Sequence, residues 1–230
     1  MKYLGFLLFA CRVVCEQRNA MASIRGSNTK MSESIEGTIS FKQVSENDYV
    51  DISVSLSGLS PNSKYGFHVH SRSVTGQDCS AAGPHFNPMN VTHGAPNDDI
   101  KKRHFGDLGN IVADSTGQVT TTLSDPLLSM FGPLSIGGLA IVIHENQDDL
   151  GRGNTALSKV DGNSGSAIAC GNILINAKLV GDSASSSKVP TIQPITQGPP
   201  PDFSSFLSGA SGHDNNLMVA LMIVTASLVL

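Results

Sequence analysis

The sequence predicts an all-β fold, an antiparallel sandwich or barrel of about seven or eight short strands. Residues 51–56 alternate strictly between apolar and polar side chains, which is typical of a half-buried strand. Turn-forming residues, such as those at 114–117, separate such segments. No stretch within residues 19–180 carries apolar residues at a sustained helical period, which argues against a helical or mixed fold.

The expected strands follow one another along the chain, and two stretches between them are too long for hairpin turns. These stretches, residues 71–107 and 145–167, are expected to be functional loops, because long loops in compact β-domains usually carry function. The strands are expected at residues 20–25, 34–41, 51–56, 65–70, 118–123, 139–144 and 169–175.

Residues 1–15 resemble a secretory signal peptide. Met1 and Lys2 precede a short apolar run, and a basic start before a short apolar core is typical of such peptides. Arg12 interrupts the run, so an uncleaved N-terminus in a cytosolic protein is the alternative. The folded domain is expected over residues 19–180.

The C-terminal part predicts a stalk and a membrane-attachment signal. Residues 181–213 are rich in Ser, Pro, Gly and Gln, which bury too little apolar surface to offset the entropy of ordering. Residues 214–230 form a hydrophobic tail whose apolar run spans about 21 Å as a helix, less than the roughly 30 Å of a bilayer core. The small residues and polar spacer before it favour a GPI-attachment signal over a short membrane anchor. We therefore expect an extracellular or cell-surface protein.

Charge and composition exclude some functions. A net charge of −4 does not suit a nucleic-acid-binding protein, and a mildly acidic surface repels an anionic substrate. The absence of Trp and the presence of only 3 Tyr argue against a large aromatic binding platform.

The cysteines support an oxidising compartment. Cys11 and Cys15 lie within the expected signal peptide, which leaves Cys79 and Cys170 as an even pair. A disulfide between these two is expected in an exported chain. Asn90 begins an Asn-Val-Thr glycosylation sequon, which by itself is a weak signal.

Six of the seven histidines lie in or beside the two long loops. His68 and His70 are two residues apart in an expected strand, so both imidazoles lie on one face, and such a pair suits a first-row transition metal. The seventh histidine, His213, lies in the tail and is assigned no role. The six are His68, His70, His85, His93, His104 and His144.

Six imidazoles and the nearby carboxylate of Asp107 exceed the needs of one tetrahedral site. They suit two metals if one imidazolate presents a nitrogen to each. Three histidines and one aspartate satisfy zinc, whereas copper accepts a tetragonal set of nitrogens with an open position. The residues therefore predict a redox-active copper beside a structural zinc.

Seven short motifs in this chain resemble the copper/zinc superoxide dismutase family in sequence, order and approximate spacing. The resemblance covers roughly residues 20–177 and implies an eight-stranded Greek-key barrel. The motifs are Gly66-Phe67-His68-Val69-His70, Gly83-Pro84-His85-Phe86-Asn87-Pro88, His93-Gly94-Ala95-Pro96, Gly106-Asp107-Leu108-Gly109-Asn110, Val142-Ile143-His144-Glu145, Asp148-Asp149-Leu150-Gly151 and Ala169-Cys170-Gly171.

The resemblance implies a role for each candidate residue. The implied copper ligands are His68, His70, His85 and His144. The implied zinc ligands are His85, His93, His104 and Asp107, so that His85 bridges the two metals. His85 and Asp148 are the implied catalytic residues, with Asp148 holding one ligand ring of each metal by hydrogen bonds. Cys79 and Cys170 match the internal disulfide of the family.

The implied activity is the conversion of superoxide to oxygen and hydrogen peroxide by alternate reduction and oxidation of copper. The resemblance implies that His85 leaves copper on reduction, takes up a proton and returns it to the peroxide product. Zinc keeps His85 in place and tunes its basicity. The partners expected are thus superoxide and the membrane to which the tail attaches.

This chain departs from the family at the entrance to the copper site. Ala167 stands where the family carries an Arg that draws in the anion. Charge steering changes association rates by roughly ten- to a thousandfold, an effect for which this enzyme family is itself an established example. Lys159 and Arg72 are candidate replacement cations, whereas the Lys-Lys-Arg run at 101–103 is interpreted as solvated surface charge. We expect slower turnover with weak salt dependence.

Two other functions remain open from the sequence. A dismutase-like metal-binding protein with low turnover would fit the loss of the Arg at Ala167. A structural β-sandwich for adhesion has only the stalk and tail in its favour. Family members often form homodimers, but Ser71, Arg72, Asn172 and Asn176 depart from the family near that face, so the oligomeric state stays open.

Overall fold

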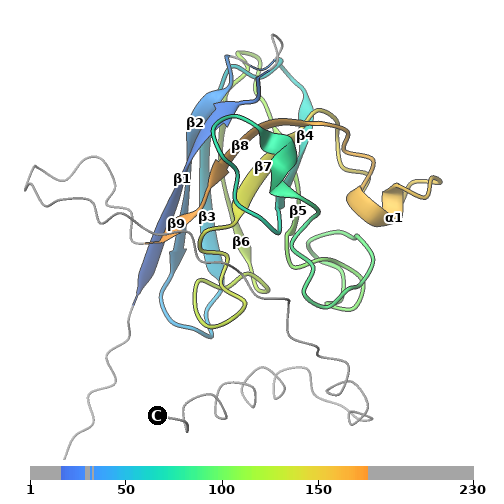
Figure 1. Cartoon of the computed structure of the whole chain (residues 1–230). Coiled ribbons are helices and arrows are strands. Elements are labelled where there is room, and N and C mark those ends of the chain that lie inside the picture. Colours follow the sequence, from blue (N-terminus) through green and yellow to red (C-terminus); the bar gives the residue numbers. More distant parts are fainter. Residues whose placement is uncertain (1–16, 29–31, 33, 176–230) are drawn as a thin grey trace, which may run out of the picture. The chain divides into compact units, whose positions relative to one another are not determined.

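The computed structural model describes residues 17–28, 32 and 34–175 of the chain (Figure 1). Its regular structure is almost entirely β, which confirms the expected fold class. A 3₁₀ turn, η1 (Cys79–Ala82), and a single helical turn, α1 (Ser158–Asp161), lie within the two long loops. The strands are β1 (Arg18–Gly26), β2 (Glu36–Gln43), β3 (Val50–Ser57), β4 (Lys64–Val69), β5 (Asp107–Val112), β6 (Val119–Asp125), β7 (Ala140–His144), β8 (Ala167–Asn172) and β9 (Leu174–Ile175).

All the strand pairs are antiparallel, and eight strands follow one another in the order β5-β4-β7-β8-β1-β2-β3-β6, with β9 added to β1. Non-consecutive neighbours, such as β4 beside β7 and β3 beside β6, are typical of a Greek-key connection. The terminal strands β5 and β6 approach each other again, which nearly closes the barrel. The eight-stranded Greek-key barrel implied by the resemblance is therefore confirmed.

Alternation along the strands builds the barrel core. In β3 the apolar residues from Val50 to Leu56 are buried and the polar residues between them are exposed. Phe41, Phe67 and Ile141 belong to the same core and are fully buried. Each such side chain contributes roughly 1.5–3 kcal/mol through removal of apolar surface from water.

The strands β4 and β7 are buried on both faces, and this double burial positions the site. Phe67 and Val69 of β4 point into the barrel core, so that His68 lies on the opposite face. Val142 of β7 packs in a second cluster outside the barrel, with Val74, Cys79, Ala82, Ala140 and Cys170. The two long loops therefore cover the outer wall of the barrel here.

The strand β5 was missed by the sequence analysis, which placed Asp107 at the end of a loop. The segment contains Gly109, with a φ of +77°, and Asn110, and it lacks the alternation that marks β3. It is a strand because it pairs with β4, joining Tyr65 to Ile111 and, beyond an irregularity, His68 to Asp107. Tertiary pairing thus outweighs a weak local signal.

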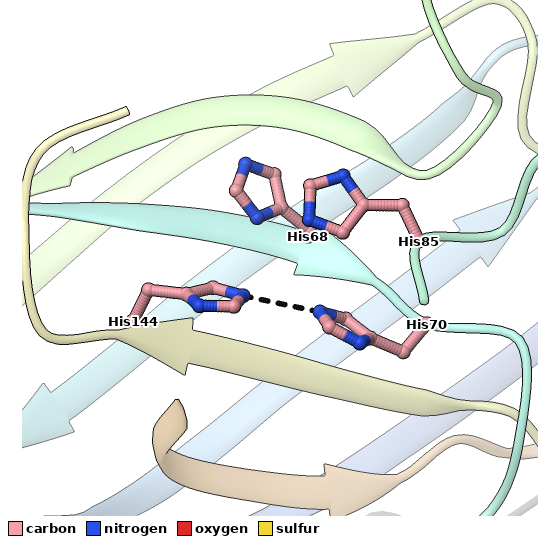
Figure 2. Close-up of side chains that lie close together, drawn as sticks. All are labelled: His68, His70, His85 and His144. Atoms are coloured by element: carbon pink, nitrogen blue, oxygen red, sulfur yellow. Dashed lines mark hydrogen bonds between the residues drawn. The ribbon is translucent and has the colours of Figure 1, made fainter. Parts of the chain in front are cut away.

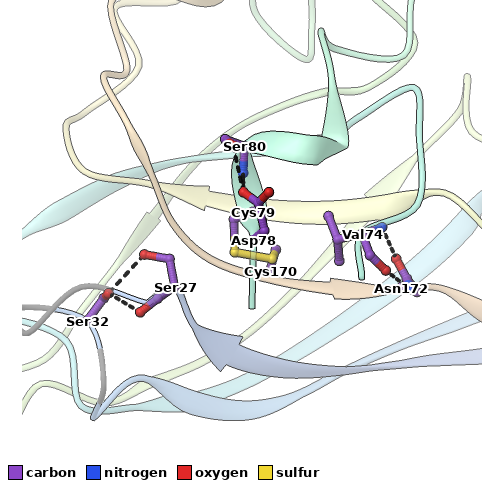
Figure 3. Close-up of a disulfide and its surroundings, with 8 residues drawn as sticks. All are labelled: Ser27, Ser32, Val74, Asp78, Cys79, Ser80, Cys170 and Asn172. Carbon is purple, nitrogen blue, oxygen red and sulfur yellow. Dashed lines mark hydrogen bonds between the residues drawn. A yellow bond between two sulfur atoms is a disulfide. The ribbon is translucent and has the colours of Figure 1, made fainter. Parts of the chain in front are cut away.

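A disulfide joins Cys79 of η1 to Cys170 of β8, with their Cα atoms 5.7 Å apart, as expected (Figure 3). Nearby, the side chain of Asn172 accepts a hydrogen bond from the backbone nitrogen of Val74 and donates one to its carbonyl, at 2.8 and 2.9 Å. The first long loop is therefore fixed to β8 by a covalent bond and by a pair of hydrogen bonds.

The expected signal peptide (1–15), the stalk (181–213) and the hydrophobic tail (214–230) lie outside the described residues. Within the part of the chain that the structure describes, no helix has the length and apolar character needed to cross a bilayer.

Candidate metal centre

Four imidazoles meet on the outer wall of the barrel, and they are called the first donor group here (Figure 2). His68 lies in β4, and His144 ends β7 at an irregularity in its pairing with β8. His85 lies in the first long loop, held to His70 by a β-bridge. All are buried, and one nitrogen from each lies within 4.8 Å of the others. The group is His68, His70, His85 and His144.

Carbonyl groups fix the orientation of two of these rings. The Nδ1 of His70 lies 2.6 Å from the carbonyl of Gly83, and the Nδ1 of His144 lies 3.0 Å from the carbonyl of Gly165. Since a carbonyl only accepts, each Nδ1 donates, and in a neutral ring Nε2 then carries a lone pair. These two Nε2 atoms face each other at 3.1 Å (dashed in Figure 2). Two facing lone pairs are stabilised by a shared cation.

The first donor group also contains polar atoms that no protein group satisfies. Among the described residues, His68 Nδ1 and His85 Nε2 are buried without a hydrogen-bond partner. A buried nitrogen without a partner is destabilising in proteins unless it binds water or a metal. The donor set is therefore well suited to a metal ion.

The second donor group surrounds the carboxylate of Asp107, at the start of β5. Its Oδ1 atom lies 2.8, 3.0 and 3.1 Å from the Nδ1 atoms of His85, His93 and His104. Tetrahedral zinc with bonds near 2.0 Å has donors about 3.3 Å apart, close to these separations. The group is His85, His93, His104 and Asp107, all buried. His85 therefore belongs to both donor groups.

The ring of His104 shows that hydrogen bonds alone do not account for how closely the second donor group is packed around Asp107. His104 Nε2 lies 3.1 Å from the carbonyl of Val91, to which it donates, so its Nδ1 presents a lone pair toward Asp107. His93 Nδ1 is close to the same carboxylate but lacks hydrogen-bond geometry. A lone pair that faces a carboxylate fits a cation between the two groups.

Asp148 connects the two donor groups. Its Oδ2 accepts from His68 Nε2 at 3.0 Å, and its Oδ1 accepts from His93 Nε2 at 2.8 Å. Both contacts leave the Nδ1 atoms free to face the donor groups. Asp148 thus lies between one ring of each donor group.

Two further residues position Asp148, and the sequence analysis assigned neither a role. Asn110 of β5 donates to the Asp148 carbonyl at 2.9 Å and accepts from its backbone nitrogen at 2.8 Å. Gly162 follows α1 with a φ of +70°, and a Cβ there would collide with Asp148 and His93. A glycine directly after a helical turn was the available signal.

Burial keeps most of the rings neutral. It lowers the pKa of His68 and His70 and lowers the pKa of His144 to about 4. Burial raises the pKa of Asp107, but the three imidazoles around the carboxylate lower it by more, so it lies below its usual range. His93 is the exception: burial opposes its charge, but Asp107 and Asp148 raise its pKa to about 9. Metal binding needs deprotonated donors, so most of the set is ready at neutral pH.

A cavity of about 260 Å³ opens over the first donor group and reaches His70, His85 and His144. Ala167, which pairs with His144 across β7 and β8, lines it. Lys159 is exposed on α1 and does not belong to this lining, and neither does Arg72, whose guanidinium lies against Gly83.

The interpretation of the Lys-Lys-Arg run as surface charge is wrong for Arg103. This side chain is fully buried, and its Nη2 donates to the Asp125 carboxylate at 2.7 Å. It also donates to the carbonyls of Pro96, His104 and Phe105. Lys101 and Lys102 are exposed as expected, and so is Asn90, which has a φ of +50°.

A nearly closed β-barrel with two donor groups that share one imidazole defines a protein built for a paired metal centre. The family model described as copper/zinc superoxide dismutase matches residues 35–173. The superoxide dismutase (Cu-Zn) of Saccharomyces cerevisiae is 43% identical over 139 residues, covering 60% of this chain and 89% of the yeast protein. The extracellular superoxide dismutase (Cu-Zn) of Caenorhabditis elegans is 41% identical over 177 residues, covering 77% and 76% of the two chains. That of Botryotinia fuckeliana is 42% identical over 158 residues, covering 69% and 98%.

The chain belongs to the copper/zinc superoxide dismutase family. The metals of this family, copper and zinc, are ones that imidazole and carboxylate donors bind well. Both donor groups of the chain therefore fit the family to which it belongs.

Proposed function

We propose that this chain is an active superoxide dismutase that holds copper in the first donor group and zinc in the second. The observation that supports the proposal most is that His85 belongs to both groups, with Nδ1 2.8 Å from Asp107 and Nε2 buried without a partner. One ring in that position can bridge two metals. When bound, copper supplies one-electron oxidation and reduction, so that two superoxide ions and two protons give oxygen and hydrogen peroxide.

The roles of the residues follow from their contacts. His68, His70, His85 and His144 are the proposed copper ligands, and His85, His93, His104 and Asp107 the proposed zinc ligands. Asp148 holds the rings of His68 and His93 by hydrogen bonds that fix their tautomers. His85 is the proposed proton carrier, because its buried Nε2 has no hydrogen-bond partner and can hold a proton whenever it binds no metal.

The test is metal analysis of the purified protein combined with an assay of superoxide consumption. We expect about one copper and one zinc per chain, with activity that requires copper. Asp107→Asn should reduce zinc content, whereas Asp114→Asn, on an exposed turn, should change neither metal. A protein that retains both metals without consuming superoxide would instead be the low-turnover metal-binding protein.

We also propose that the protein acts outside the cell. The relative from Caenorhabditis elegans is named extracellular, and residues 1–15 resemble a signal peptide. A GPI anchor attached after removal of the tail is the finer proposal. Phosphatidylinositol-specific phospholipase C should release the protein from the surface of expressing cells, and a chain lacking residues 214–230 should enter the medium untreated. Retention after phospholipase treatment would contradict the anchor and leave the enzymatic proposal intact.

A further inference from the structure

The cavity over the first donor group has an unusual distribution of charge. Three of its lining residues are the histidines already described. Of the rest, Asp161 is the one that carries a formal charge at neutral pH. The others offer hydroxyl, aliphatic, disulfide or backbone surface and are Cys79, Ser80, Gly83, Pro84, Val160 and Ala167.

Asp161 is held in place by its surroundings. It ends α1, and its Oδ1 accepts a hydrogen bond from the backbone nitrogen of Asn163 at 3.0 Å. Its carbonyl accepts from the hydroxyl of Ser164, a fully buried residue. Gly162, between them, turns the chain with a positive φ. The carboxylate is therefore fixed at the cavity.

The carboxylate acts on the first donor group. Asp161 and His144 line the same cavity, so the carboxylate and any ion bound beside that imidazole share one space. A negative charge that stabilises a cation at His144 destabilises an anion in the same space by Coulomb's law.

No lysine or arginine is among the described residues that line the cavity. Lys159 is two residues from Asp161 but points into solvent, and the guanidinium of Arg72 lies against Gly83 outside the lining. Ala167 contributes only a methyl group. Among the lining residues, Asp161 alone therefore brings a carboxylate charge to the cavity.

We infer that Asp161 is a specificity-determining residue that disfavours anions and favours cations in this cavity. The inference rests on the proposed function in one respect: superoxide is the anion whose entry Asp161 slows. Salt screens exposed charges, with a Debye length of about 10 Å at 0.1 M. Superoxide consumption by this chain should therefore rise, rather than fall, as ionic strength increases.

The first experiment compares Asp161→Asn with the unmodified protein, both loaded with copper and zinc. Asn keeps the size of the side chain and removes the charge. At low ionic strength we expect superoxide consumption to rise roughly three- to tenfold, and its increase with salt to disappear. The control is Asp51→Asn, which makes the same change in net charge on an exposed position of β3, where Asp51 accepts from Ser124. This control should keep the original rate and salt dependence.

The second experiment does not depend on turnover. Azide, a small anion that binds copper(II), is titrated by visible absorption, and copper(II) uptake by the zinc-loaded, copper-free protein is followed in parallel. Asp161→Asn should bind azide roughly three- to tenfold more tightly and take up copper more slowly. Opposite changes for an anion and a cation distinguish a charge effect from a local distortion, which would change both in the same direction.

Equal azide affinity in Asp161→Asn and the unmodified protein would overturn the inference, as would a rate that falls with salt in the unmodified protein. If the loaded protein consumes no superoxide, the proposed function fails, yet the azide and copper measurements still decide the role of Asp161.

Discussion

At the scale of single residues, the histidine rings of the donor groups other than His85 are each oriented by a contact at the nitrogen that points away from the donor group. The carbonyls of Gly83, Gly165 and Val91 each engage one nitrogen of a histidine, and Asp148 engages one in each of two more. In every case the opposite nitrogen faces the donor group. The protein therefore orients the rings before any metal binds, which reduces the cost of ordering the donors.

The raised pKa of His93 predicts that zinc binding releases a proton. Its pKa is raised to about 9, so in the metal-free protein the ring carries a proton at neutral pH that zinc must displace. We expect zinc binding at pH 7.5 to release close to one proton from His93, and none from it above about pH 10. Calorimetry in buffers of different ionisation enthalpy measures this release. Equal proton release at both pH values would contradict the prediction.

The raised pKa of His93 also predicts how the stability of the metal-free protein depends on pH. The pKa of His93 in the folded state lies above its ordinary value of 6.5, so its contribution to stability is complete below about pH 6.5 and is lost as pH rises through about 9. The size is roughly 3 kcal/mol. Urea unfolding of the metal-free protein at pH 6.5 and 9.5 measures the loss, and a flat profile would count against it.

Single residues were predictable from the sequence to different degrees. The spacing of His68 and His70 gave their shared face directly, because a strand has a period of two. The surroundings of Arg103 could not be predicted, because its partner Asp125 lies 22 residues away on another element. Gly162 was missed for a similar reason: the atoms that exclude a side chain there belong to Asp148 and His93.

At the scale of elements, the first long loop is fixed to the barrel at both ends of its course. The disulfide and Asn172 hold its beginning to β8. Arg103 holds its end to Asp125, the last residue of β6, which also accepts from the backbone nitrogens of Leu127 and Leu128 at 2.8 Å. His104 directly follows Arg103, so this ion pair also places a proposed zinc ligand.

The substitution Arg103→Met tests how much this buried ion pair contributes to the free energy of unfolding. The substitution keeps apolar bulk but leaves Asp125 charged and buried, which costs about 3–5 kcal/mol in comparable cases. Denaturant unfolding of the metal-free protein measures the loss. Lys102→Met is the matched control, because Lys102 is exposed and should change stability by less than about 0.5 kcal/mol. Similar losses in the two variants would show that the buried pair has no special role.

The elements themselves were predictable where burial is one-sided. The strand β3 alternates because one face meets the core and the other meets solvent. The strand β5 contains Gly109 and Asn110 and is buried on both faces near Asp107. Its sequence therefore lacks the alternation of apolar and polar residues that marks a half-buried strand. The turns η1 and α1, of 4 residues each, are too short to show a helical period.

At the scale of the whole molecule, a net charge of −4 works against an anionic substrate. Ala167 lines the cavity, so a long cation introduced there can reach its entrance. We expect Ala167→Arg to raise superoxide consumption by roughly tenfold at low ionic strength and to make the rate fall with salt. Ala167→Gln, long and uncharged, is the control. Equal rates for the two variants would refute the electrostatic explanation.

The disulfide closes a loop across most of the barrel, because its two cysteines are 91 positions apart in sequence. Chain entropy predicts that replacing both buried cysteines with Ala lowers stability by about 4 kcal/mol. Denaturant unfolding measures the loss, and the reduced unmodified protein should show a similar one. A loss below about 1 kcal/mol in both would mean that the bond constrains the unfolded chain little.

The position of Cys79 also links the metal-binding chemistry of this chain to the cellular compartment in which the chain folds. Gly83, whose carbonyl orients His70, directly follows the turn that begins at Cys79. Disulfides form in exported proteins and are rare in the cytosol, where reductants keep thiols reduced. A copy kept in the cytosol would retain its barrel core, yet would hold the His70 ring less firmly. Loss of the disulfide is therefore expected to weaken the retention of copper.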